Sequence, residues 1–391
     1  MTQVRLSRDE LTHAGYAVLA TWAWFLYGFG SLLPLLRAEQ DISRTVTGLH
    51  SLALSAGALI SGSFTVPLVR ALRRRGVVRL GLALISVGVV GLCLSRTPLL
   101  SLPSVLVIGT GGSILVNGAN PSLSEHHGEA RAAALSEGNA VAAGVGLLAP
   151  LAVGAGVALG WGWRPAALLV IPMTVLVALL LRRVPAGTQA LDAVLERRSG
   201  PAGRLPGSFW LFAAALVCCV GIEFVCTAWS ADLMHTRLGL STAAASAAVT
   251  AVVAGMAAGR ALLGRLALRL PARHLLAAAL ALTVIGWLVT WTATAAPLAV
   301  IGLVVMGLGI AGHYPLGMSL VLAAVPGRAD RAASVVSIGI GVSAGAAPFT
   351  VGALADATST HAAFVVVPVL VVVASGLLLA ATRLTRRPAL S

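Results

Sequence analysis

Long apolar runs follow one another along nearly the whole chain, separated by short clusters of arginine, proline or other polar residues. A helix of about 20 apolar residues crosses the hydrocarbon layer of a bilayer, and each run comes close to that length or exceeds it. The sequence therefore predicts an all-α polytopic membrane protein. The twelve expected transmembrane helices cover residues 13–37, 46–69, 77–95, 99–124, 132–160, 163–181, 208–234, 241–264, 274–294, 296–325, 332–354 and 361–382.

Composition argues against the soluble classes of protein. Of the 391 residues, 58% are hydrophobic and only 10% are charged, whereas about a quarter are charged in an ordinary soluble domain. Disorder is also excluded, because it requires low hydrophobicity. The net charge of +14 does not indicate nucleic-acid binding, because the arginines lie at the ends of apolar runs. The expected partner is the lipid bilayer.

The arginines also predict the orientation of the chain in the membrane. All 27 basic residues are arginine; 21 fall on one side of the twelve expected spans and five on the other, and Arg260 lies within a span. Because cytoplasmic loops carry the excess of positive charge, we predict a multi-pass protein of the cytoplasmic membrane with both termini inside. The four cysteines lie in apolar runs without C-x-x-C spacing, so neither disulfides nor a metal site are expected. No cofactor is expected.

Several short patterns recur at a nearly constant distance of half the chain. Ser55-Ala-Gly-Ala is followed 198 positions later by Val253-Ala-Gly-Met, and Ala149-Pro150 is followed at the same distance by Ala347-Pro348. Such an offset indicates an internal duplication, which is common among transporters. We therefore predict an N-terminal six-helix bundle at 1–182, a cytoplasmic loop at 183–207 and a C-terminal six-helix bundle at 208–391. A monomer is expected.

Two six-helix halves joined by a cytoplasmic loop resemble the major facilitator superfamily. The basic turn Val69-Arg-Ala-Leu-Arg-Arg-Arg-Gly76 adds to the resemblance, although Arg70 stands where that family usually has Asp. The resemblance implies a secondary active transporter, not an enzyme. It further implies that the halves rock about a central site lined by spans 1, 4, 7 and 10. Arg70 is then expected at the cytoplasmic gate.

Two stretches resemble the fucose-permease-like sugar/proton symporters. One is Asn117-Gly-Ala-Asn-Pro121, followed by Asn139, and the other is Gly221-Ile-Glu223 with Trp229-Ser230. This resemblance implies uptake of a small polar or amphipathic solute by proton symport, with Asn139 and Trp229 at the substrate. Proton-coupled efflux of a drug or metabolite is the alternative. A membrane-embedded enzyme or a transport-dead sensor is disfavoured, because the chain shows no catalytic constellation and leaves no room for an output domain.

Ionisable groups at membrane depth are costly, so each one is a functional candidate. Glu223 lies near the middle of span 7, in a weakly polar stripe with Cys219, Cys226, Thr227 and Ser230. No arginine lies within one helical turn of it. We predict that Glu223 faces a cavity, where it carries the coupling proton or contacts the substrate; the alternative is a protonated glutamate bonded to a neighbouring helix.

Other polar residues lie where they could line a solute path. Span 4 carries Ser113, Asn117, Asn120 and Ser124 on one helical face, and asparagine offers both donors and acceptors to a ligand. Helix–helix hydrogen bonding is the alternative for this stripe. Substrate contacts are also predicted for Trp24 and Tyr27 in span 1 and for His313, which lies between Gly309 and Gly317 in span 10. For Trp24 and Tyr27 the alternative is ordinary packing, and for His313 it is a neutral histidine that donates a hydrogen bond to a neighbouring helix.

Two further ionisable residues lie near the cytoplasmic ends of their spans. Glu137 in span 5 and Arg260 in span 8 are predicted to form gate salt bridges, with extension to water as the alternative. Asp232 is expected in an external vestibule. The pair His126-His127 lies in a cytoplasmic turn without further histidines nearby, so metal binding is not expected there.

Overall fold

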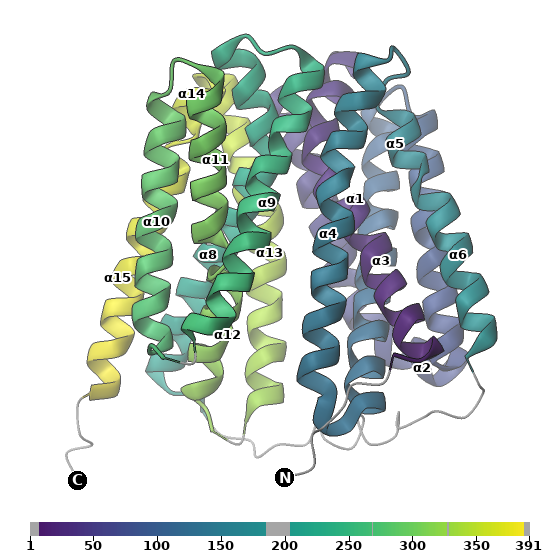
Figure 1. Cartoon of the computed structure of the whole chain (residues 1–391), viewed down its shortest axis with the longest axis vertical. Helices are drawn as coiled ribbons and strands as arrows, with labels where there is room; N and C mark the ends of the chain where they lie inside the picture. The colour runs from purple at the N-terminus through teal and green to yellow at the C-terminus, as the bar shows by residue number, and fades with distance from the viewer. Residues whose placement is uncertain (1–7, 185–203, 268, 327, 387–391) are drawn as a thin grey trace. The chain divides into compact units, whose positions relative to one another are not determined.

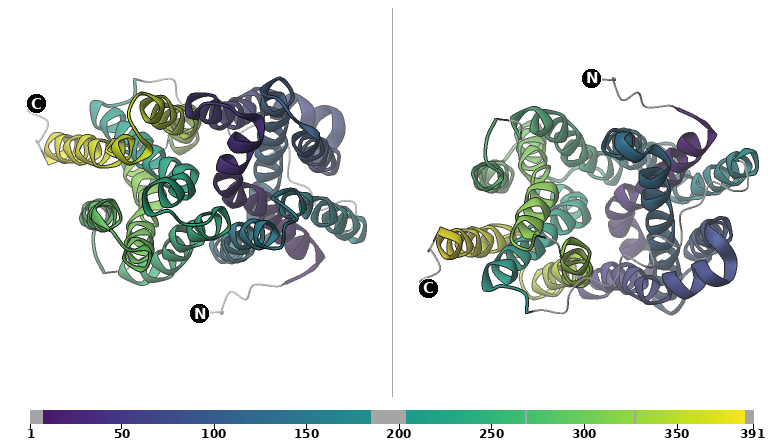
Figure 2. Two further views of the ribbon diagram at one scale, coloured as in Figure 1. Left: turned by 90° about the horizontal axis from the view of Figure 1, so that it is seen from above. Right: turned by 90° about the horizontal axis from the view of Figure 1, so that it is seen from below.

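The computed structural model describes residues 8–184, 204–267, 269–326 and 328–386, together with most but not all of the side chains within its helices. These residues form helices and contain no β-strand. They group into two compact units, one made of Met1–Ala190 with Ser241–Thr250 and the other of Leu191–Leu240 with Ala251–Ser391. Figure 2 shows each unit end-on as a bundle of helices. The predicted loop 183–207 lies largely outside the described residues.

Unit 1 contains the first six helices. They are α1 (Glu10–Gln40), α2 (Arg44–Leu94), α3 (Pro98–His127), α4 (Arg131–Ala158), α5 (Arg164–Leu168) and α6 (Val170–Arg183), with the short 3-10 turn Gly128–Ala130 before α4. Side-chain caps begin two of them: Asp9 accepts a hydrogen bond from the Thr12 backbone N–H, and Ser43 accepts one from that of Val46. Such caps satisfy N–H groups that have no partner within the helix.

The expected break in the helix between spans 2 and 3 is wrong, because all 51 residues of α2 are helical. It nevertheless supplies two spans. A Cβ on Gly57 would press against Thr110 of α3, and one on Gly88 would press against Ile108 of the same helix. In a straight helix Gly57 and Gly88 would lie about 46 Å apart at 1.5 Å per residue. Both can reach the same turn of α3 only because α2 reverses direction between them.

Unit 2 contains the remaining helices. They are α8 (Gly207–Leu238), α9 (Thr242–Leu266), α10 (Ala272–Thr292), α11 (Ala296–Ile310), α12 (His313–Ala323), α13 (Ala329–Ala357), α14 (Thr360–Ala363) and α15 (Val366–Arg386). The start of α9 groups with unit 1. There Ser31 Oγ donates to the Ser246 carbonyl at 3.0 Å, and Ser246 Oγ donates to the Ser31 carbonyl at 3.1 Å.

Two features of unit 2 position its polar residues. Helices α9 and α11 approach so closely that a Cβ on Gly255 would collide with the backbone of Val304, and one on Gly307 with that of Val252. Small residues permit this kind of contact between membrane helices. The expected tenth span is divided at Ala311 and Gly312 into α11 and α12. The break places His313 at the first position of α12.

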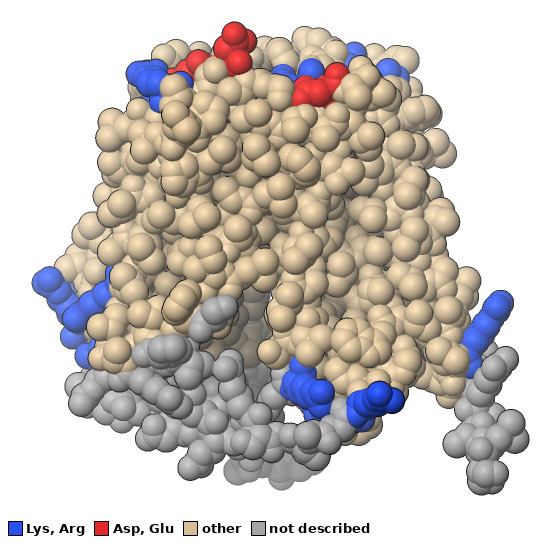
Figure 3. Space-filling view, turned by 180° about the vertical axis from the view of Figure 1, so that it is seen from behind, with Lys and Arg blue, Asp and Glu red and all other residues tan. Residues whose placement is uncertain are grey.

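The helices have the length and composition of membrane spans. Among the described residues, eleven helical segments are long and apolar enough to cross a bilayer. The first leg of α2, expected to be a further span, carries several side chains that are not described. On the face shown in Figure 3, charged side chains gather near the two ends of the helices, and the band between them is uncharged. This band matches the requirement of a hydrocarbon layer.

Candidate functional site

Among the residues that the structure describes, Glu223 lies within a membrane-spanning helix of unit 2 and forms an ion pair with one cation, Arg260. Its carboxylate Oε1 lies 3.9 Å from Nη2 of Arg260, and the two side chains are 17% and 38% exposed. Arg260 comes from α9 and Glu223 from α8, so the absence of a nearby arginine in the sequence did not reveal this pairing. At 3.9 Å the contact is an ion pair without a direct hydrogen bond.

The rest of the predicted stripe around Glu223 is packed away. Cys219, Cys226 and Ser230 are fully buried, and Cys226 Sγ lies 3.5 Å from Sδ of Met306 on α11. Thr227 uses its hydroxyl to donate to the backbone carbonyl of Glu223 at 2.9 Å. Only Glu223 and Thr227 of this stripe therefore keep any exposed surface.

The structure adds Tyr314 to the surroundings of Glu223. Tyr314 lies on α12, its side chain is within electrostatic range of Glu223, and it is 46% exposed. A partly exposed phenol on an apolar helix can offer both a donor and an acceptor. Its rarity was one signal that could have drawn attention to Tyr314, because the chain has three tyrosines.

His313 lies in the interior of unit 2, where it joins three helices. It is fully buried; its Nδ1 lies 3.3 Å from the carbonyl oxygen of Cys219 on α8, and its Nε2 lies 3.1 Å from Oγ1 of Thr283 on α10. The helix face that carries His313 is closely packed on both sides, because a Cβ on Gly309 would press against Thr283 and one on Gly317 against Leu216. Both ring nitrogens are engaged within the unit.

The polar stripe of span 4 is present on α3. Asn117 is exposed, and its amide donates to Ser113 Oγ at 3.3 Å while Ser113 donates to the Ala58 carbonyl at 3.4 Å. Asn120 is half-buried, and its Oδ1 is a buried oxygen without a hydrogen-bond partner among the described residues. An exposed amide on a membrane helix is costly against lipid, which favours a water-filled path beside it.

The remaining predicted contacts have different surroundings. Trp24 donates from its indole to the Ala166 carbonyl at 2.9 Å, and Tyr27 packs on Gly146 of α4. Trp229 is 2% exposed and donates to the Pro348 carbonyl at 2.8 Å, which ties α8 to α13. Asn139 is exposed and donates to the carbonyl of Leu135 on its own helix. Trp24 and Trp229 therefore use their indole N–H groups in helix packing.

Glu137 forms a salt bridge within unit 1. Arg8, just before α1, donates to both carboxylate oxygens, at 2.7 and 3.2 Å. Close by, Asp9 accepts hydrogen bonds from Thr12 and from His126 at 2.5 Å. Partial burial acts to raise the pKa of Asp9, but these hydrogen bonds outweigh it and hold that pKa below its usual value.

The sequence also predicted positions for Arg70 and Asp232. The side chain of Arg70 lies outside the described residues, so its predicted gate role stays a prediction. The expectation that Asp232 lies in an open vestibule is wrong, because this residue is 1% exposed and accepts a hydrogen bond from Thr360. Its position near the end of α8 concealed that α14 covers it. No cluster of potential metal ligands occurs among the described residues.

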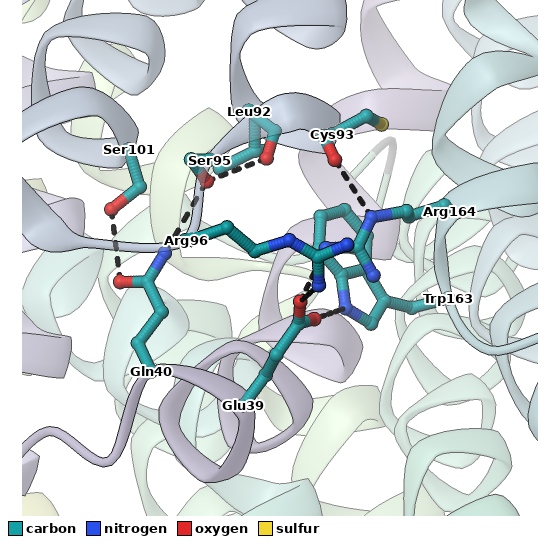
Figure 4. A network of polar contacts seen from close by, with 9 residues as sticks. All are labelled: Glu39, Gln40, Leu92, Cys93, Ser95, Arg96, Ser101, Trp163 and Arg164. Atoms are coloured by element: carbon teal, nitrogen blue, oxygen red, sulfur yellow. Dashed lines mark hydrogen bonds and ion pairs between the residues drawn. The ribbon is translucent and has the colours of Figure 1, made fainter.

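A polar cluster that the sequence did not predict lies in unit 1, where α1 meets α2 (Figure 4). Glu39 accepts hydrogen bonds from Arg96, from Arg164 at 2.5 Å and from the Trp163 indole at 3.3 Å. Arg164 also donates to the Cys93 carbonyl at 2.7 Å. Glu39 thus connects the end of α1 to the turns that follow α2 and α4.

The sequence as a whole matches one family model, that of the Major Facilitator Superfamily, over residues 15–222 and 211–391. The chain belongs to this superfamily. As a member it is a membrane transporter and not an enzyme, as the resemblance implied. No curated relative matches the sequence.

Solved structures agree with the fold. The chain is similar to the E. coli xylose transporter XylE, with a TM-score of 0.76 and 14% identity over 95% of this chain and 97% of that one. It is similar to the E. coli fucose:proton symporter FucP, with a TM-score of 0.62 and 17% identity over 95% of this chain and 98% of that one. It is also similar to a bacterial homolog of the human lysosomal transporter Spinster, with a TM-score of 0.74 and 15% identity over 98% of each chain. At these identities the likeness establishes the fold alone.

Proposed function

We propose that this superfamily member takes up a small polar or amphipathic solute together with protons, by alternating access. The observation that carries the proposal is the surroundings of Glu223. Its carboxylate is mostly enclosed within a membrane-spanning helix, and it has one cation, Arg260, at 3.9 Å. An ionisable group at that depth is costly to keep unless it is used.

The geometry of this pair suits a group that gains and loses a proton. When Glu223 is ionised, Arg260 compensates its charge; when Glu223 binds a proton, no direct hydrogen bond with Arg260 has to break, because none exists at 3.9 Å. The half-exposed Arg260 side chain can then turn toward water. Arg260 acts here as the charge partner of the coupling acid, which refines the gate role predicted from sequence.

The solute path on unit 1 is assigned to α3. Asn117 and Asn120 offer an exposed amide and a buried carbonyl oxygen without a described partner, which suits a solute with hydroxyl, amide or carboxylate groups. Asn117→Ala and Asn120→Ala are expected to lower flux at least about tenfold, while detergent stability changes by under about 1 kcal/mol. If both variants transport normally, the stripe serves only helix packing.

The orientation in the membrane also belongs to this proposal. The excess of arginine on one side puts both termini and the 183–207 loop in the cytoplasm. It puts the α1–α2, α2–α3 and α4–α5 turns of unit 1 outside. External labelling of Ala202→Cys, in a background with the four cysteines replaced, would contradict this topology.

The coupling role is tested in liposomes that contain the purified protein. We expect a gradient that is alkaline inside to drive accumulation of at least one probe among D-xylose, L-fucose and uridine, and a protonophore to abolish it. In Glu223→Gln, pH-driven accumulation should fall at least about tenfold, whereas exchange of the same probe should stay within about twofold. Glu10→Gln, at an exposed position, is the matched control.

Each outcome distinguishes between roles. Normal pH-driven accumulation by Glu223→Gln would refute the coupling role of this residue. Loss of exchange as well as accumulation would instead make Glu223 a substrate contact. Faster probe entry when the gradient is acidic inside would favour proton-coupled efflux.

A further inference from the structure

His50 ends a chain of hydrogen bonds that crosses three segments of unit 1. The residue lies on the first leg of α2 and is fully buried. Its Nδ1 lies 3.0 Å from the carbonyl oxygen of Val46, and its Nε2 lies 2.8 Å from Oγ of Ser101 on α3. Ser101 is fully buried too, and no solvent can replace a missing partner at either group.

The chain continues from Ser101 to the end of α2. Ser101 Oγ donates to Gln40 Oε1 at 3.2 Å, and Gln40 Nε2 donates to Ser95 Oγ at 3.3 Å. Ser95 Oγ donates to the Leu92 carbonyl at 2.6 Å. Figure 4 shows this part of the chain, with Gln40 between the two serines.

The donors and acceptors of this chain determine how many protons His50 must carry for every hydrogen bond to form. Carbonyl oxygens only accept, and a hydroxyl has one hydrogen to donate. Ser95 gives its hydrogen to Leu92, Gln40 gives an amide hydrogen to Ser95, and Ser101 gives its hydrogen to Gln40. Ser101 must then accept a hydrogen from His50 Nε2, while Val46 accepts one from Nδ1. The arrangement with every bond made therefore requires a proton on both ring nitrogens.

In a neutral His50 the single ring proton belongs on Nδ1, because the Val46 carbonyl can only accept a hydrogen; Nε2 is then bare, and the bonds beyond it run in the opposite direction. With Nδ1–H still donating to Val46, the bare Nε2 accepts the hydrogen of Ser101. The Gln40 amide then turns over, so that its NH₂ group donates to Ser101 and its oxygen accepts from Ser95. Ser95 loses its bond to the Leu92 carbonyl. Amide orientations of this kind follow from the hydrogen-bond network, and here the histidine sets it.

We infer that His50 is a proton-binding site whose occupancy reverses the direction of hydrogen bonding through Ser101 and Gln40 to Ser95. The proton comes from water, binds to Nε2, and turns the Ser101 hydrogen toward Gln40. Burial opposes the positive charge, while two well-placed acceptors favour it. Histidine is the side chain suited to such a change near neutral pH.

Some of the charged groups around this chain have partners of their own. The charged residues nearest in sequence to members of this chain are Arg37 and Glu39 on α1, Asp41 at the end of α1, Arg44 on α2 and Arg96 beyond α2. Arg164 on α5 is distant in sequence but contacts Glu39. Glu39 pairs with Arg96 and Arg164. Within the described residues, no ion pair includes His50. Its proton therefore changes the local charge and is not offset by an acid.

The reversal acts directly beside the Glu39 cluster. Gln40 follows Glu39 in α1, and Ser95 precedes Arg96, so the two ends of the switched bond adjoin both members of an ion pair. The proton on His50 thus reaches the contacts that hold the end of α1 against the turn between α2 and α3. On the proposed topology these contacts face the external medium.

The test follows the ring nitrogens of His50 by NMR in ¹⁵N-histidine-labelled protein in lipid nanodiscs. The chain has eight histidines, and His50→Gln identifies the relevant signal by its loss. In the wild type we expect a change from the neutral Nδ1–H form to the doubly protonated form between about pH 8 and pH 5. In Ser101→Ala the midpoint should fall by about one pH unit, a tenfold loss of proton affinity, because protonated Nε2 loses its acceptor.

Ser104→Ala is the matched control. Ser104 is a buried serine on the same helix whose hydroxyl donates to the Leu100 carbonyl and does not contact His50. Its midpoint should equal that of the wild type. A His50 signal in one form from pH 8 to pH 5 would overturn the proposal, as would equal shifts in Ser101→Ala and Ser104→Ala. Because no solute is involved, this result is independent of the transport assay.

Discussion

Glu39 and Glu223 are both glutamates on long membrane-spanning helices, but their partners differ. Glu39 accepts from two arginines and an indole, with its side chain 22% exposed. Glu223 is enclosed to a similar degree, at 17% exposed, and has one arginine at 3.9 Å. A carboxylate held by several charge-assisted donors is stable in its ionised form. A carboxylate with a single longer contact can exchange a proton without breaking such bonds.

The difference separates a structural acid from a functional one. Enclosure alone does not distinguish the two, because their exposed fractions are nearly equal. The two acids differ instead in the number and the length of the contacts that their carboxylates make. The contacts of Glu39 suit a role in holding unit 1 together, whereas those of Glu223 suit the proposed role in proton coupling, and each role can be tested separately.

Removing the charge of Glu39 should have the largest effect on stability. Glu39→Gln leaves Arg96 and Arg164 without their acid, and hydrogen bonds to charged groups contribute about 1.5–3 kcal/mol each when well formed. Because both arginines keep contact with water, we expect a loss of about 2 kcal/mol. The melting temperature in detergent should fall by about 4–8 °C. pH-driven uptake per folded molecule should remain; its loss would give Glu39 a coupling role.

Removing the partner of Glu223 should change the pH dependence of transport. Arg260→Gln takes away the cation that favours ionised Glu223, so this acid should keep its proton to higher pH. The arginine is 38% exposed, and solvent screening limits the expected effect to about tenfold, or about 1.4 kcal/mol. The pH profile of uptake should therefore move about one unit toward alkaline pH. An unchanged profile would show that the pair does not act in coupling.

Replacing either arginine that pairs with Glu39 should lower the stability by less than Glu39→Gln does, and the two losses should differ from one another. Arg96 is 74% exposed and Arg164 is 27% exposed; Arg164 also donates to the Cys93 carbonyl. Arg164→Gln is expected to cost about 1 kcal/mol of stability, and Arg96→Gln about half of that or less. Thermal unfolding of the two variants measures the difference. Equal losses would indicate that exposure does not limit these contacts.

The sequence was sufficient to predict the helices and the family, because both depend on local hydrophobicity and on repeats along the chain. It was less informative where a helix bends or where distant segments meet. The reversal of α2 follows from its packing on both sides of α3, which no local signal encodes. Trp229 was expected at the substrate, but its hydrogen bond to the Pro348 carbonyl depends on a helix more than 100 positions away.

The partners of the two acids could not be predicted for the same reason, because they come from segments that are distant in the sequence. Glu39 was taken for a residue at the end of a span, and its partners Arg96 and Arg164 become neighbours only when the helices pack. Arg260 was predicted near the cytoplasmic end of its span, yet α9 brings it to Glu223. Single residue types at membrane depth are visible in a sequence, whereas the pairs that decide their chemistry are not.

Infrared difference spectroscopy between pH 8 and pH 5 shows whether Glu223 is the group that binds the proton, because the carbonyl stretch of a protonated carboxyl group reports the proton itself. We expect the wild type in lipid to gain such a band on acidification. The band should disappear from the spectrum of Glu223→Gln and remain in that of Glu39→Gln. A band that persists in Glu223→Gln and is lost in Glu39→Gln would contradict the account, because Glu39 would then be the acid that exchanges the proton.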